Sequence, residues 1–174
     1  MAEIGNHPGM ADTGQGCPID AARLERATPD DAAELMVLQR CCWVDEAIAN
    51  DTFDVPALRE TVDEVTSWIG SWDTWVVRLD GRLIGAVRAR RAGNDWEIGR
   101  LMVAPDLAGR GLGRWLLAHA ESAAPDGVEA ISLYTGKQSL RNIAMYQRAG
   151  FELTDDPAPH SAVSLRKPVS RSSA

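Results

Sequence analysis

A strand, a glycine-rich loop and a helix start follow one another between residues 101 and 114, and this junction constrains the chain most. An apolar run ends at Val103, and Pro105 stops the strand. The loop then contains three glycines at alternate positions: Gly109, Gly111 and Gly113. The start of a helix presents unpaired N–H groups and the positive end of the helix dipole, so this junction predicts an anion-binding site. Glycine lets the backbone approach a phosphate closely.

Two common phosphate-binding motifs do not fit this loop. The dinucleotide fingerprint is Gly-x-Gly-x-x-Gly, and counting from Gly109 places Arg114 at the third glycine. The Walker motif ends in Gly-Lys-Ser/Thr, and no such lysine is present. A tight turn without a ligand would not require three glycines followed by a helix.

The loop resembles the acetyl-CoA loop of the GNAT-type N-acetyltransferase superfamily. That loop reads Val-x-Pro, two residues, then Gln/Arg-x-x-Gly-x-Gly/Ala, and the stretch from Val103 to Gly113 follows it. Ala108 departs from the pattern, because it stands where Gln or Arg is usual. The resemblance implies acetyl-CoA as co-substrate and no metal. The residues that it implies for cofactor binding in this stretch are Leu101, Met102, Val103, Ala108, Gly109, Arg110, Gly111, Leu112, Gly113 and Arg114.

A second stretch, residues 142–151, resembles the closing signature of the same family, which has an Asn, a Tyr one helix turn later and Gly-Phe at the helix end. Tyr146 occupies the position of the tyrosine that reaches the CoA sulfur in the family. Asn142 lies on the same helix face as Tyr146, whereas many members carry Asn seven residues before the tyrosine, where this chain has Ser139. Either Ser139 or Asn142 is therefore expected to hold the cofactor.

Acetyl transfer to an amine requires a base, because an alkyl ammonium with a pKa near ~10.4 has no lone pair. Glu97 lies on the strand before the loop, where several family members carry a glutamate base; others use a water chain. Strand alternation places Glu97, Gly99, Leu101 and Val103 on one face, unless a bulge intervenes. The family supplies oxyanion donors from backbone N–H groups, here at about residues 101–103. Tyr146 would protonate the departing thiolate.

The order of expected elements is β-α-α-β-β-β-α-β-α-β-β, which is that of the GNAT fold. We expect an α/β fold with a mixed, mostly antiparallel central sheet and helices on both faces. Expected strands are residues 22–27, 74–79, 82–88, 96–103, 128–134, 151–153 and 161–165. Helices are expected to begin at Thr28, at Asp54 (running to Trp72), after Gly113 and at Ser139. The expected domain covers residues 21–168, between tails at 1–20 and 169–174.

Composition excludes several functional classes. The net charge of −7 argues against a nucleic-acid partner, and no apolar run is long enough to span a membrane. Cys17, Cys41 and Cys42 give no disulfide framework or metal-ligand spacing, which fits a reducing cytoplasm. Three tryptophans on the first two helices are expected to pack in the core: Trp43, Trp68 and Trp72.

The charges segregate along the chain. Basic residues cluster around the loop and the two helices that follow: Arg110, Arg114, Lys137, Arg141 and Arg148. This cluster suits an anionic cofactor despite the negative total charge, because salt screens distant charges within ~8 Å. Acidic residues lie between the first two helices, in a segment that borders the acceptor site in the family: Asp45, Glu46, Asp51 and Asp54.

The sequence therefore predicts a cytoplasmic, acetyl-CoA-dependent N-acetyltransferase, monomeric or homodimeric. It would transfer the acetyl group to a small-molecule or protein amine by direct attack in a ternary complex. The alternative is a non-catalytic acyl-CoA-binding regulatory domain on the same fold.

Overall fold

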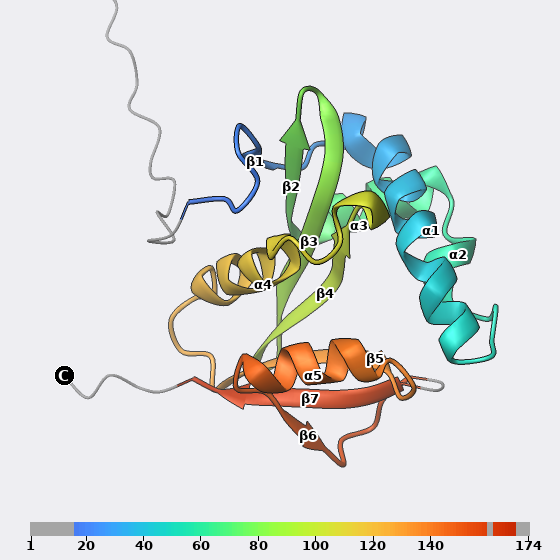
Figure 1. Cartoon of the computed structure of the whole chain (residues 1–174). Coiled ribbons are helices and arrows are strands. Elements are labelled where there is room, and N and C mark those ends of the chain that lie inside the picture. The colour runs from blue at the N-terminus through green and yellow to red at the C-terminus, as the bar shows by residue number, and fades with distance from the viewer. Residues whose placement is uncertain (1–15, 160–161, 170–174) are drawn as a thin grey trace, which may run out of the picture.

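A seven-stranded sheet organises the part of the chain that the computed structural model describes, residues 16–159 and 162–169 (Figure 1). The strand order is β1-β2-β3-β4-β5-β7-β6, and only β4 and β5 pair in parallel. The strands are β1 Arg23–Arg26, β2 Asp73–Leu79, β3 Arg82–Ala92, β4 Asp95–Val103, β5 Ala130–Gly136, β6 Glu152–Thr154 and β7 Ala162–Pro168. The predicted mixed, mostly antiparallel sheet is confirmed.

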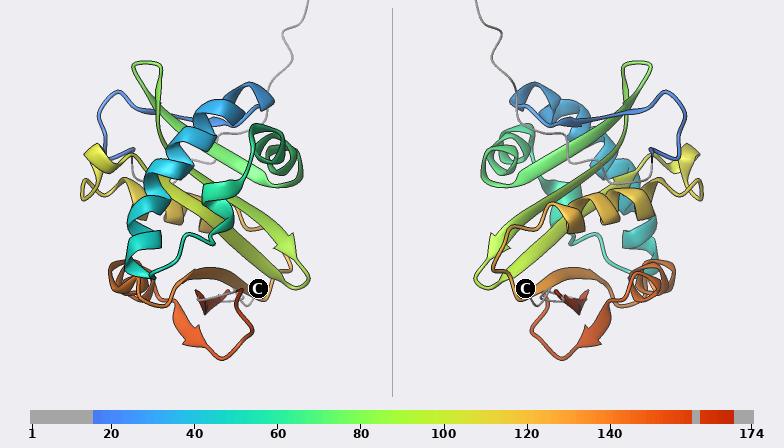
Figure 2. Two further views of the ribbon diagram at one scale, coloured as in Figure 1. Left: turned by 90° about the vertical axis from the view of Figure 1, so that its right-hand side faces the viewer. Right: turned by 90° about the vertical axis from the view of Figure 1, so that its left-hand side faces the viewer.

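Helices cover both faces of this sheet (Figures 1 and 2). The α-helices are α1 Ala32–Ala49, α2 Pro56–Arg59, α3 Val62–Ser71, α4 Leu112–Ser122 and α5 Leu140–Arg148. Short 3-10 turns, η1 Pro29–Asp31 and η2 Pro105–Leu107, precede α1 and the glycine loop. None of the helices in the described ranges is long and apolar enough to cross a membrane.

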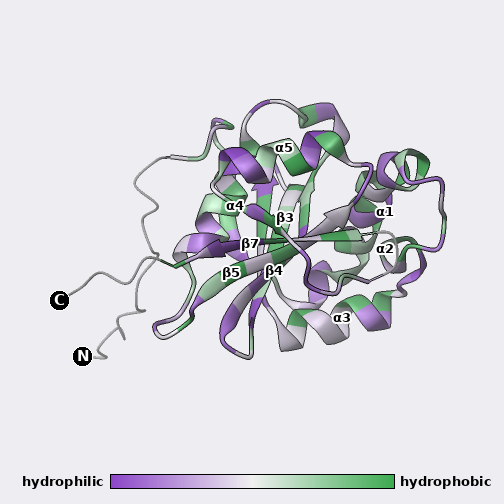
Figure 3. Cartoon of the chain, turned by 90° about the horizontal axis from the view of Figure 1, so that it is seen from below, coloured by the Kyte–Doolittle hydropathy of each residue, from purple (hydrophilic) through white to green (hydrophobic). Residues whose placement is uncertain are grey.

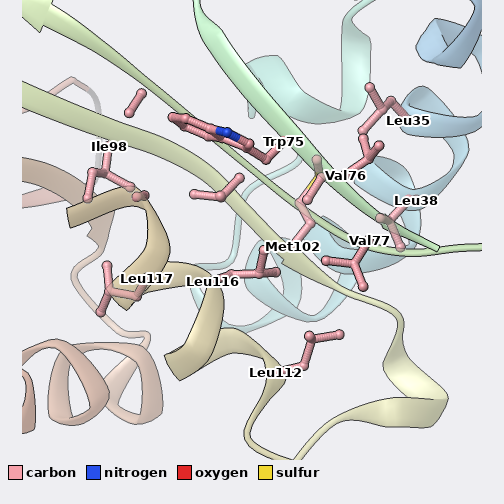
Figure 4. Packing of buried hydrophobic residues seen from close by; sticks show 14 of the residues in the cluster. Leu35, Leu38, Trp75, Val76, Val77, Ile98, Met102, Leu112, Leu116 and Leu117 are labelled. Atoms are coloured by element: carbon pink, nitrogen blue, oxygen red, sulfur yellow. The ribbon is translucent and has the colours of Figure 1, made fainter. Parts of the chain in front are cut away.

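The core lies where α1 and α4 meet the two faces of the central strands. Leu116 and Leu117 of α4, Met102 of β4 and Leu35 of α1 all belong to this buried hydrophobic cluster (Figure 4). Gly85 of β3 allows α4 to approach, because a Cβ atom there would lie 3.1 Å from the Leu116 side chain. Hydrophobic residues accordingly concentrate in the central strands, and hydrophilic ones mix along the outer helix turns (Figure 3).

The predicted single helix from Asp54 to Trp72 is wrong, because two helices occupy this stretch. The extended backbone of Glu60 ends α2, and Thr61 caps α3. The Thr61 hydroxyl accepts the Glu64 N–H at 3.3 Å, and the Glu64 carboxylate accepts the Thr61 N–H at 2.7 Å. This reciprocal cap starts a new helix within an uninterrupted hydrophobic pattern, which periodicity alone cannot reveal.

The predicted strands at residues 74–79 and 82–88 form a hairpin whose turn is Asp80-Gly81. Both residues have positive φ, 49° and 81°, as a type I′ turn requires. The strand after the turn, β3, continues to Ala92 and is longer than predicted.

A bulge at Arg100 changes the predicted face of β4. Arg88 pairs with Gly99 and Ala86 pairs with Met102, so β4 has one more residue than β3 between these pairs. Arg100 has a positive φ of 49° at this point. Gly99 therefore faces Trp72, the residue that follows α3, whereas the Val103 side chain lies toward Gly113 of α4. The bulge for which the expectation made an exception is therefore present, and Glu97, Gly99, Leu101 and Val103 do not all share one face.

Most of the two predicted tails, residues 1–15 and 170–174, lies outside the described residues, so the N-terminal tail is described only from residue 16. Ile19 is buried in the core, and Pro18 lies within 3.7 Å of the position that a Cβ atom on Gly111 would take. The chain before β1 therefore packs against the glycine loop.

Candidate active site

Strands β4 and β5 are paired only over their first halves. The parallel register runs from Asp95 opposite Ala130 to Ile98 opposite Leu133 and then stops. Beyond Ile98, β4 continues to pair with β3, and β5 continues to pair with β7. The two strands thus separate in the middle of the sheet, and the gap between them begins beside Leu133.

The far half of β4 turns polar backbone groups toward this gap. Ala104 N–H donates to Ile84 of β3 at 2.8 Å, so strand alternation directs the N–H of Val103 away from β3. The Val103 carbonyl, on the same side, accepts the Cys42 thiol at 3.2 Å. The backbone region expected to stabilise an oxyanion therefore borders the opening.

A cavity of about 350 Å³ lies where the strands separate. Its walls come from α1, the α1–α2 connection, β3, β4, β5 and α5. The two predicted catalytic residues, Glu97 and Tyr146, both line it, and so does Asn142. The fold thus brings Glu97 and Tyr146, which are almost fifty residues apart in the sequence, into one cavity.

Tyr146 reaches this cavity from α5 and is only 8% exposed. Its ring packs edge-on against Phe151, with 6.1 Å between the ring centroids. Burial, assisted by the negative charge of Glu46, raises the pKa of the Tyr146 phenol well above its ordinary value. The phenol therefore keeps its proton at neutral pH and is a hydrogen-bond donor in the cavity.

Glu97 faces the same cavity but is held by a neighbouring cation. Its carboxylate accepts two contacts from the Arg90 guanidinium, 3.0 Å from Nε and 2.9 Å from Nη2. Arg90 lies directly opposite Glu97 in the β3–β4 pair, so the sheet register fixes this ion pair.

The glycine loop has the backbone conformation that its sequence predicts. Gly109 and Gly111 have left-handed φ values of 82° and 87°, and Gly111 is the N-cap of α4. The turn before the loop is held by Arg82, which binds the Asp106 carboxylate through two contacts of 2.8 and 2.7 Å. The start of α4 lies beside the end of β4, because a Cβ atom on Gly113 would lie 3.6 Å from the Val103 side chain.

The predicted cofactor-binding residues of this stretch differ in accessibility. Met102 and Leu112 are buried in the core, so only their backbone atoms could contact a ligand. The side chains of Ala108, Arg110 and Arg114 are exposed. Gly113 is close to α5, because a Cβ atom there would lie 3.9 Å from the Met145 sulfur. The remaining residues of the predicted basic cluster are also exposed: Lys137, Arg141 and Arg148.

Ser139 and Asn142, the two candidates for binding the cofactor, both form hydrogen bonds with residues at the C-terminal end of α1. Ser139 Oγ accepts Asn50 Nδ2 at 3.1 Å, and Asn142 Nδ2 donates to the Glu46 carboxylate at 3.3 Å. The other oxygen of Glu46 accepts the Gly136 N–H at 2.9 Å. The C-terminal end of α1 is thus fastened to the start of α5. The sequence placed Glu46 in an acidic segment but gave no sign of Asn50, since these contacts join residues far apart in the chain.

Two arginines that the sequence analysis missed also line the cavity, together with two of the tryptophans expected in the core. Trp43 and Trp72 are only partly buried and form part of the cavity wall. Arg100 lies over the Trp43 ring, 5.3 Å from its centroid, and forms an ion pair with Glu60. The Arg88 guanidinium lies 4.1 Å from the Trp72 centroid. Of the three tryptophans, only Trp68 is buried as predicted.

No cluster of three or more His, Cys, Asp or Glu side chains that could hold a metal ion occurs in residues 16–159 and 162–169. The three cysteines are free thiols.

The family of the chain follows from comparison with known proteins. A family model described as the acetyltransferase (GNAT) family matches residues 38–151. The chain belongs to this family. The residues matched by the family model include the cavity residues on α1, the glycine loop and Tyr146.

Named GNAT relatives extend the comparison. The mycothiol acetyltransferase of Propionibacterium freudenreichii subsp. shermanii is 31% identical over 148 residues, which are 77% of this chain and 44% of that protein. The chain spans less than half the length of the curated relatives that it matches. Among solved structures, PaiA N-acetyltransferase from Thermoplasma acidophilum in complex with coenzyme A is 19% identical, with a TM-score of 0.75 over 85% of this chain and 99% of that chain. The GNAT domain of S. lividans PAT is 20% identical, with a TM-score of 0.70 over 85% of this chain and 90% of that domain. These structures share the fold.

Proposed function

We propose that this chain is an acetyl-CoA-dependent N-acetyltransferase that transfers the acetyl group directly to an amine in a ternary complex. The observation that supports this most is the position of Tyr146, a protonated phenol in a cavity at the gap between β4 and β5. Membership of the GNAT family and the likeness to a fold neighbour solved with coenzyme A agree with it.

The residues around the gap fit an acyl-CoA. The glycine loop and the start of α4 offer backbone N–H groups for the phosphates, with Arg110 and Arg114 exposed beside them. The separated strands leave space for an extended, flexible arm that ends in the cavity, where backbone N–H groups of residues 101–103 would bind the thioester oxygen.

In the proposed reaction the acceptor ammonium first loses a proton to Glu97, directly or through water. The amine lone pair then attacks the thioester carbon, the C–N bond forms, and the C–S bond breaks. The nitrogen passes its second proton to water, and the departing thiolate takes a proton from Tyr146, whose phenolate regains one from water. A thiol pKa of about 8.5 makes the thiolate a fair leaving group, so a single hydrogen-bond donor suffices.

Direct transfer is favoured over an acetyl-cysteine intermediate. Cys42 is the cysteine that lines the cavity, and burial raises the pKa of its thiol to about 11. Its Sγ also donates to the Val103 carbonyl. A thiol in this state supplies little thiolate, which is the nucleophilic form.

The test is turnover with acetyl-CoA and a panel of amines, followed by the release of free thiol. The proposal predicts amine-dependent thiol release that is lost or strongly reduced in Tyr146→Phe. Tight CoA binding without turnover of any amine would instead support a non-catalytic acyl-CoA-binding domain.

A further inference from the structure

Arg88 projects from β3 into the cavity without a hydrogen-bond or ion-pair partner among the described residues, and its Nε is fully buried. Its neighbours are the faces of two tryptophans, with the guanidinium carbon 4.6 Å from the Trp68 centroid and 4.1 Å from the Trp72 centroid. Aromatic faces attract a cation but accept no N–H hydrogen bond of normal strength. The tryptophans therefore hold the guanidinium in place and leave its outer N–H groups available to the cavity.

The charges around Arg88 do not balance. Three guanidinium groups gather here, from Arg88, Arg90 and Arg100, against two carboxylates, from Glu60 and Glu97. Each carboxylate already has its own partner, because Glu97 pairs with Arg90 and Glu60 pairs with Arg100. One positive charge is left over, and it belongs to Arg88.

This excess charge is unfavourable in the protein alone. Burial, and then the repulsion of Arg100, lowers the pKa of Arg88 to about 9. Glu60 compensates only in part, since one of its oxygens pairs with Arg100 and the other accepts Gln39 Nε2 at 2.8 Å and the Trp68 indole N–H at 3.3 Å. A buried, unpaired cation that faces a cavity is typical of a site that binds an anionic ligand.

We propose that the acceptor is an amine that also carries a carboxylate, and that Arg88 binds this carboxylate. A single excess positive charge matches a carboxylate monoanion better than a phosphate dianion. The planar guanidinium matches a carboxylate through two parallel N–H contacts. In the same cavity, Glu46 lies close enough to Tyr146 to raise the pKa of its phenol. The cavity is thus cationic at Arg88 and acidic near the reacting thioester, as an amino acid acceptor requires.

The inference rests on the proposed acetyltransferase function and deepens it. The test compares amino acids with their primary amides and with the amines that lack the carboxylate, at saturating acetyl-CoA. The amino acids should have roughly ten- to a hundredfold higher kcat/KM, since a hydrogen-bonded charge contact is lost in the other two sets.

Arg88→Gln should reduce this preference to within about threefold and leave the amides almost unaffected. The matched control is Arg91→Gln on the same strand, because Arg91 is exposed, is not part of the cavity wall and donates to the Asp126 carbonyl. This variant should retain the full preference for the carboxylate, so a general loss of charge or of stability cannot mimic the result.

Three results would overturn the inference while acetyl transfer remains intact: equal use of amides by the unaltered chain, an unchanged preference in Arg88→Gln, or a preference for amines that carry a phosphate. A binding measurement covers the case in which no amine turns over. N-acetyl amino acids, the expected products, should bind in the presence of CoA at least about tenfold more tightly than their amides. If no amine turns over but the N-acetyl amino acids still bind more tightly than their amides, only the proposed reaction is contradicted. If the acids and the amides bind equally, the role of Arg88 is contradicted.

Discussion

Replacing Tyr146 by Phe removes a single hydroxyl from the proposed reaction centre and little else. The ring is buried and packs edge-on against Phe151, and phenylalanine retains this packing. No hydrogen bond of the Tyr146 hydroxyl to the described residues has to be broken. Removing a hydroxyl that has no protein partner changes folding stability by little, so the melting temperature should stay nearly constant.

The expected loss in rate follows from the thiolate. The raised pKa of Tyr146 keeps the phenol protonated at neutral pH, and its position in the cavity lets the hydroxyl donate to the sulfur as the C–S bond breaks. Without this donor the thiolate must leave unprotonated, but a group with a conjugate-acid pKa of about 8.5 does so readily. We expect kcat to fall about 10²-fold, which is about 2.7 kcal/mol of transition-state stabilisation.

The assay measures thiol release at saturating acetyl-CoA and acceptor, with CoA binding measured separately by calorimetry. The KM for acetyl-CoA should change by less than about threefold, because the lost contact forms mainly in the transition state. Tyr134→Phe is the control, since Tyr134 is the only other tyrosine, lines the cavity and is 42% exposed. An unchanged kcat, a loss of CoA binding, or an equal defect in Tyr134→Phe would refute the assignment of Tyr146 as the acid.

Three further predictions concern the base, the glycine loop and a buried histidine. Glu97→Gln should lower kcat/KM and flatten the acid limb of its pH profile, and an unchanged profile would place the base elsewhere. Ala108→Gln should tighten acetyl-CoA binding by a few-fold with little change in kcat, because a polar side chain beside the phosphates binds ground and transition states alike; a weaker Kd would contradict the predicted position of Ala108 at the phosphates. Burial lowers the pKa of His119 from 6.5 and leaves both ring nitrogens without partners in the described structure. The unfolded chain therefore binds the proton more readily, so stability is complete above about pH 6.5 and falls below it. Urea unfolding should show a smaller loss between about pH 7 and pH 5.5 in His119→Phe, and an equal loss would exclude this linkage.

Local sequence patterns predicted the parts of the site that depend on backbone conformation. Gly109 and Gly111 adopt the left-handed conformation that side chains disfavour, and they do so at the helix start where the sequence placed them. Tyr146 lies on the predicted helix, and Gly150, with a φ of 91°, ends it as predicted. These features were predictable because each is determined within one strand–loop–helix segment.

Features that depend on tertiary contacts were not predictable from local patterns. The bulge at Arg100 uses a non-glycine residue at positive φ, so no turn residue marks it. The bonds from Glu46 and Asn50 to the start of α5 join distant segments that carry no common motif. Arg88 follows an uninterrupted apolar run in β3, and its lack of a partner is visible only when Trp68, Trp72 and β4 are packed around it.

The measurement that tests direct acetyl transfer most simply follows a labelled acetyl group. The chain is mixed with labelled acetyl-CoA, first alone and then with an acceptor amine, and the reaction is quenched within a single turnover. We predict that the label stays on CoA until the amine is added and then appears only on the amine, with one free thiol formed for each acetylated acceptor. Label on the protein before the amine is added, or label that never leaves CoA with any amine, would contradict the account.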